Sequence, residues 1–63
     1  MDEQRAVDSH RATIRDHIEK YNRYEGSEKD TALSTIQNAQ RQIRDIMRHK
    51  PSISSSSEDN WSP

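Results

Sequence analysis

The sequence predicts an all-α protein, an antiparallel hairpin of two helices that assembles as a dimeric four-helix bundle or docks on a partner. Apolar residues recur every three, four or seven positions in two stretches, residues 3–25 and 28–49. The chain's only glycine, Gly26, lies between these stretches. From Pro51 onward the composition becomes serine-rich, so we expect residues 1–50 to form the hairpin and residues 51–63 to be a disordered, acidic tail.

The first helix is expected over residues 3–25, which contain no proline or glycine. Its apolar residues fall on one helical stripe: Val7, Ile14, Ile18, Tyr21 and Tyr24. Either Asp2 or the pair Asp8–Ser9 can cap its N-terminus.

The turn is expected at residues 26–27. Gly26 suits the end of a helix because it accepts the positive φ that a Cβ would strain. Ser27 can cap the next helix, with Asp30 completing a capping-box-like pattern, or Asp30 can cap a helix that begins at Thr31. A connection this short makes the two helices antiparallel neighbours.

The second helix is expected over residues 28–49, because Pro51 disfavours a helical conformation at Lys50. Its stripe contains Ala32, Leu33, Ile36, Ala39, Ile43, Ile46 and Met47. We expect one seam from the two stripes to carry assembly: Val7, Ile14, Ile18, Tyr21, Leu33, Ile36, Ile43 and Met47.

The composition predicts that the hairpin needs a further surface. Apolar residues make up 27% of the 63 residues and charged residues 33%. Domains of this size bury only about 60% of their unfolded surface, and two helices alone bury one side of each. The sequence therefore predicts that the chain pairs with itself as a homodimer or docks on a larger protein.

The tail carries six serines and two prolines among its thirteen residues, a composition typical of flexible linkers. Ser55 and Ser56 each precede an acidic residue by three positions, which resembles the substrates of acid-directed serine kinases; a solubilising linker is the alternative. Trp61 can fold back onto the hairpin, anchor in a partner's pocket, or stay exposed.

Basic residues gather at the end of the second helix, where Arg41, Arg44, Arg48 and Lys50 face a single acid, Asp45. They can complement the helix dipole, or they can contact nucleic acid or an acidic protein. In length and topology the chain resembles the small dimeric hairpin proteins of the plasmid Rop type, which bind RNA loops. The candidates for partner contact are Tyr24, Arg41, Arg44, Arg48 and Trp61.

Catalysis and metal binding have no support in the sequence. No cysteine is present, no glycine-rich phosphate loop occurs, and the carboxylates alternate with basic residues as on a solvated surface. His10 and His17 are about 10.5 Å apart along a helix, too far to chelate one metal ion. We therefore expect no cofactor and no enzymatic activity.

No apolar run is long enough for a bilayer, so no membrane contact is predicted and the cytoplasm is the expected compartment. The prediction is a small non-enzymatic protein-binding or regulatory protein that acts through helix–helix interactions as a homodimer or as a docked adaptor or inhibitor. The alternative is a helical-hairpin dimer that binds RNA or DNA with its basic end.

Overall fold

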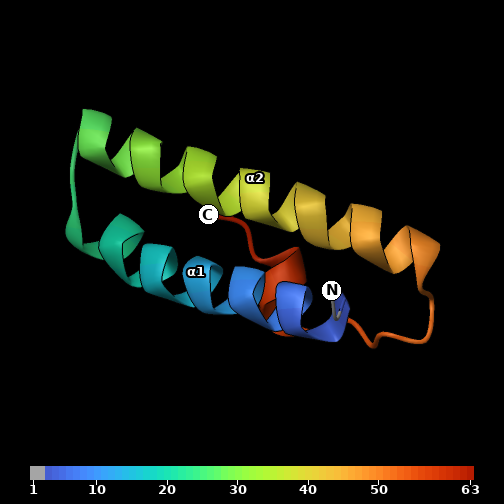
Figure 1. Ribbon diagram of the computed structural model, residues 1–63. Helices are drawn as coiled ribbons and strands as arrows, with labels where there is room; N and C mark the ends of the chain where they lie inside the picture. The colour runs from blue at the N-terminus through green and yellow to red at the C-terminus, as the bar shows by residue number, and fades with distance from the viewer. Residues whose placement is uncertain (1–2) are drawn as a thin grey trace.

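The computed structural model describes residues 3–63, which form two long antiparallel α-helices and one short 3₁₀ helix (Figure 1). Helix α1 spans Glu3–Arg23, α2 spans Ser27–His49 and η1 spans Ser57–Asn60. The described chain measures 37 × 18 × 15 Å along its principal axes. The predicted all-helical hairpin is confirmed.

The helix boundaries differ slightly from the prediction. The first helix ends at Arg23 and not at residue 25, and the backbone N–H of Tyr24 donates a last helical hydrogen bond to the Lys20 carbonyl at 2.8 Å. Asp2, one predicted cap, lies outside the described residues. Asp8–Ser9, the alternative cap, is wrong because both residues lie inside α1.

Gly26 sets the reversal of the chain. Its φ of 68° and ψ of −138° are accessible to glycine and strained for other residues, and it is the N-cap residue of α2. Its carbonyl accepts a hydrogen bond from the Asp30 backbone N–H at 3.3 Å. The predicted Ser27 cap is wrong because the glycine conformation starts the helix one residue earlier, and no side chain caps this end. The alternative start at Thr31 is also wrong.

The seam between α1 and α2 holds the core. Val7, Ile14, Ile36 and Ile43 are fully buried within the single chain. The other four predicted seam residues are half-buried: Ile18, Tyr21, Leu33 and Met47. Periodic apolar residues therefore pair the two helices with each other, and whether the same residues also carry assembly stays a prediction.

The tail differs from the disordered segment that its composition predicts. It leaves the end of α2, turns back, and places η1 against both long helices (Figure 1). Ile53 is buried in the core, and Trp61 packs against it. The predicted disorder is therefore not confirmed. The segment is polar on average, but it contains two apolar side chains, Ile53 and Trp61, whose burial stabilises its contact with the hairpin.

Replacing Gly26 with alanine is expected to destabilise the hairpin by about 1–3 kcal/mol. The space around Gly26 is open, so the cost comes from the backbone conformation and not from a clash. Urea unfolding followed by circular dichroism measures it. Glu25→Ala, an exposed change in the same turn, is the control and is expected to shift stability by less than about 0.5 kcal/mol. Equal stability of Gly26→Ala and wild type would contradict this account of the turn.

Candidate partner-binding surfaces

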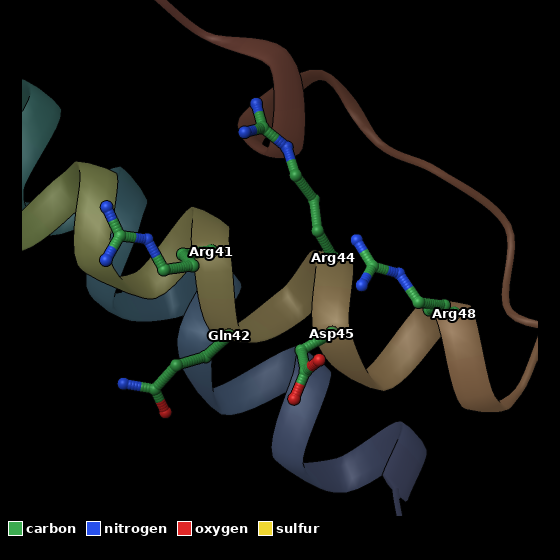
Figure 2. Close-up of a pocket in the computed structure, with 5 residues that line it drawn as sticks. All are labelled: Arg41, Gln42, Arg44, Asp45 and Arg48. Atoms are coloured by element: carbon green, nitrogen blue, oxygen red, sulfur yellow. The ribbon is translucent and has the colours of Figure 1, made fainter.

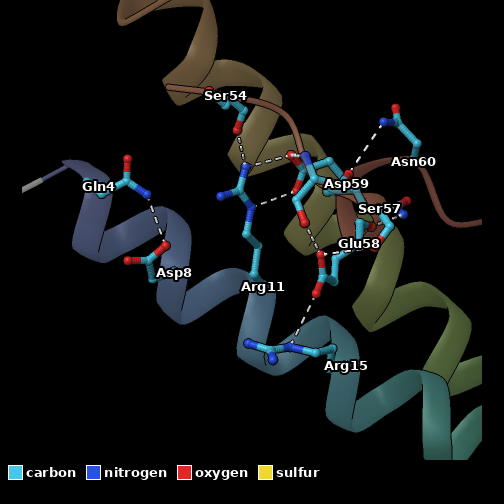
Figure 3. A network of polar contacts seen from close by, with 11 residues as sticks. Gln4, Asp8, Arg11, Arg15, Ser54, Ser57, Glu58, Asp59 and Asn60 are labelled. Carbon is cyan, nitrogen blue, oxygen red and sulfur yellow. Dashed lines mark hydrogen bonds and ion pairs between the residues drawn. The ribbon is translucent and has the colours of Figure 1, made fainter. Parts of the chain in front are cut away.

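An ion pair between α1 and η1 fixes the tail to the hairpin (Figure 3). The Arg11 guanidinium donates from Nε to Asp59 Oδ1 at 3.0 Å and from Nη2 to Asp59 Oδ2 at 2.8 Å. Nη2 also donates to the carbonyl of Ser54 at 2.7 Å. The Arg11 and Asp59 side chains are only 14% and 4% exposed, so this two-point contact is shielded from water.

Gln40 of α2 holds the tail from the other helix. Its Nε2 donates to the carbonyl of Glu58 at 3.0 Å and to the carbonyl of Trp61 at 2.8 Å. Gln40 is 5% exposed, so the tail satisfies both donors of an amide that water cannot reach. The two helices therefore bind the tail through one charged group and one amide.

The apolar part of the contact is Trp61 on Tyr21. Their ring centroids are 5.4 Å apart and the ring planes meet at 79°, an edge-to-face arrangement. The ammonium of Lys29 lies 4.6 Å from the centroid of the Tyr21 ring, on which it makes a cation–π contact. Of the three fates predicted for Trp61, the structure shows the first, packing on the hairpin. We call Arg11, Tyr21 and Gln40 the tail-docking surface.

The acidic residues of η1 have lowered pKa values. The hydrogen bonds from Arg11 lower the pKa of Asp59, and the Ser56 backbone N–H, which donates to Oδ2 at 3.0 Å, adds to the effect. A hydrogen bond from the Ser56 hydroxyl lowers the pKa of Glu58, with a smaller contribution from Arg15, 3.4 Å away. Both carboxylates are therefore stabilised in the charged form while the tail is docked.

The sequence prediction missed Arg11, Gln40 and Asp59. Arg11 stands four residues after Val7 and three before Ile14, and Gln40 stands in the same relation to Ile36 and Ile43. Each therefore interrupts an apolar stripe at a position that faces the neighbouring elements. Polar residues at two equivalent core-facing positions indicate buried hydrogen bonds, and this signal could have revealed the site.

A second surface lies on the outer side of α2, around a shallow depression lined by Arg41, Gln42, Arg44, Asp45 and Arg48 (Figure 2). We call Arg41, Arg44 and Arg48 the arginine face; all three are exposed. Within residues 3–63, the guanidinium groups of Arg41 and Arg48 make no ion pair. Arg44 extends toward η1, where its charge contributes to the lowered pKa of Asp59. The arginine face therefore keeps two cations available for an external anion.

Tyr24, the remaining predicted contact residue, is half-buried just after α1. Lys50, which belongs to the basic end of α2, pairs with Glu3 at 3.1 Å, so the positive charge at this end is partly neutralised. His17 and His49 each place Nδ1 2.9 Å from the carbonyl four residues earlier. The described residues contain no group of three or more side chains suited to a metal ion.

Neither long helix, over the part of the chain that the structure covers, combines the length and apolar character that a membrane crossing requires.

Comparison of the chain with protein-family models, curated proteins and solved structures finds no match. The functional argument therefore depends on the two surfaces themselves.

Acidification is expected to release the tail before the hairpin loses its helices. Because the folded pKa of Asp59 lies below its unfolded value of about 3.9, its contribution is complete above that value and is lost as pH falls through the folded pKa. Trp61 is the only tryptophan, so its fluorescence emission reports the release. In Asp59→Asn the acid transition is expected to shrink, since this carboxylate no longer titrates. An emission spectrum that stays constant from pH 7 to pH 2 in the wild type would contradict this role of the carboxylate.

Proposed function

We propose that this chain is a small, non-enzymatic protein-binding protein that regulates or recruits a larger protein through its helix surfaces. The supporting observation is the arginine face, where Arg41 and Arg48 are exposed on α2 and make no ion pair within residues 3–63, although Asp45 lines the same depression. The cytoplasm is the compartment we propose for it.

The chemistry of the arginine face favours an acidic partner. Arg41 and Arg48 are seven residues apart, about 10.5 Å or two turns along the helix, so they can contact two carboxylates that lie two turns apart on an acidic helix. Guanidinium groups bind carboxylates through two parallel hydrogen bonds, which fixes orientation as well as charge. A partner helix with acidic residues at similar spacing would match this surface.

Homodimerisation is the other form of this proposal. The fully buried seam residues already pair within one chain, so a four-helix bundle would use the half-buried ones, Ile18, Tyr21, Leu33 and Met47. Sedimentation velocity at micromolar concentration is expected to show a species of about twice the 7.4 kDa chain mass if they do. A monomer with a cooperative thermal transition would restrict the proposal to a different partner.

Nucleic acid is the second candidate, supported by the same two arginines, Arg41 and Arg48. Guanidinium groups also bind phosphates, and the length and topology of the hairpin suit an RNA or DNA site. Two phosphate contacts on a duplex, from Arg41 and Arg48, would give a slope of about −1.8 for log affinity against log salt concentration. A protein interface with few ion pairs depends less steeply on salt, so this slope separates the two candidates.

Reversing two charges on the arginine face is expected to abolish partner capture. In affinity capture from cell lysate, Arg41→Glu with Arg48→Glu should reduce the captured partner at least tenfold, because each lost charged hydrogen bond costs about 1.5–3 kcal/mol. Arg5→Glu with Arg23→Glu gives the same net charge on exposed positions of α1 and should retain capture.

Nuclease treatment of the lysate separates the two partner classes. Capture that survives nuclease and is lost only in the arginine-face variant supports a protein partner. Loss after nuclease supports the alternative, and equal capture by both variants would contradict a role for this face.

A further inference from the structure

We infer that the tail-docking surface is a peptide-binding site, that the chain's own tail occupies it reversibly, and that an acidic segment of a partner protein can take its place. The segment follows the pattern seen in the tail: isoleucine, five residues, aspartate, one residue, tryptophan. This inference deepens the proposed protein-binding function and rests on it.

The hairpin recognises peptide chemistry at two shielded points. Arg11 binds a carboxylate with two nitrogens. Gln40 binds two main-chain carbonyls three residues apart, that of Glu58 in η1 and that of Trp61 just after it. Carbonyl groups occur in every peptide, so the Gln40 contacts do not depend on side-chain identity. Specificity then comes from the carboxylate at Arg11 and from the aromatic ring at Tyr21.

Charge favours an acidic occupant. Besides Arg11, Arg15 contacts Glu58 of the tail at 3.4 Å, and Arg44 contributes to lowering the pKa of Asp59. Three arginines from two helices therefore surround the two carboxylates of η1. An occupant that lacked these carboxylates would leave the shielded guanidinium of Arg11 without its partner, which is costly.

The way the tail is held makes it replaceable. The hydrogen bonds that its backbone N–H groups donate to backbone carbonyls are local, from Ile53 to Lys50, from Asp59 to Ser56 and from Trp61 to Glu58. Its only large apolar side chains are Ile53 and Trp61, and most of its other residues are exposed. Segments with few buried apolar contacts open more easily than the core, so the tail can leave while the α1–α2 seam persists.

A different protein fits the surface better than a second copy of this chain. The tail of a second copy offers the same contacts, while the chain's own tail is present at an effective concentration on the order of millimolar. Exchange between identical tails therefore gains nothing at micromolar concentration. A partner segment with a larger anchor or more carboxylates can outcompete the tail.

The test uses the full-length chain and a fluorescently labelled synthetic peptide with the sequence of residues 51–63. The full-length variant Asp59→Asn with Trp61→Ala disables the chain's own tail and keeps the docking residues. Fluorescence anisotropy is expected to show saturable binding to this variant and at least tenfold weaker binding to wild type. A peptide with asparagine in place of Asp59, and a receptor that also carries Arg11→Met, should each weaken binding at least tenfold.

A second measurement does not depend on the folding of the variant. In isotope-labelled wild type, excess unlabelled peptide is expected to speed the hydrogen exchange of the Asp59 and Trp61 amides, because the chain's own tail is displaced. The side-chain amide signal of Gln40 should keep its bound position, since the peptide supplies the same carbonyls.

No saturable binding to the tail-disabled variant, together with unchanged exchange of the tail amides in wild type, would overturn the inference. Equal affinity of the peptide for wild type and for the tail-disabled variant would also overturn it, because the peptide would then bind elsewhere. If adding the peptide made the wild type dimerise, the displaced tail would be binding a second copy of the chain. That result would also overturn the partner segment as the occupant.

The two proposals fail separately. Loss of lysate capture in the arginine-face variant is measured without the peptide, and peptide binding is measured without lysate. A chain that binds the peptide and captures no partner would refute the arginine face as a contact and leave the tail-docking surface standing.

Discussion

The shielded ion pair between Arg11 and Asp59 is the contact on which the third element of this fold depends. Two helices bury only the sides that face each other, and the composition of the chain is poor in apolar residues. The tail supplies the missing cover, but only two of its side chains are large and apolar. The carboxylate of Asp59 therefore has to bring a polar segment against α1, and Arg11 provides the charge that compensates its burial.

The arginines of this chain occupy two different environments. Arg11 is enclosed and paired inside the protein, whereas Arg41 and Arg48 are exposed and have no ion-pair partner within residues 3–63. Exposed ion pairs contribute little to stability, so unpaired surface cations cost the fold little. The inner arginine thus serves to organise the molecule, and the outer ones support the proposal of an external acidic partner.

The sequence predicted the helices well because their signal is repeated. Apolar residues at three- and four-residue spacing over two stretches, separated by one glycine, define a hairpin redundantly. The predicted disorder of the tail is not confirmed, and the signal for order in this segment rests on single residues. Ser56 and Asp59 form the reciprocal pattern of a capping box, and Ile53 and Trp61 are isolated anchors, all within a segment whose average composition favours disorder. Arg11 was overlooked because arginine is usually a surface residue. Its place in the apolar stripe indicates a buried contact, but the partner, 48 residues away, does not follow from that pattern.

That separation of 48 residues imposes an order on folding. The contacts between α1 and α2 flank a short turn at Gly26, so the chain can close them early, as low contact order allows. Before the hairpin forms, a long flexible segment separates Arg11 from Asp59, and bringing its two ends together is entropically unfavourable. Once α2 lies beside α1, the short stretch after His49 is all that separates the tail from its site. Docking of the last segment is thus a late step that completes a scaffold already in place.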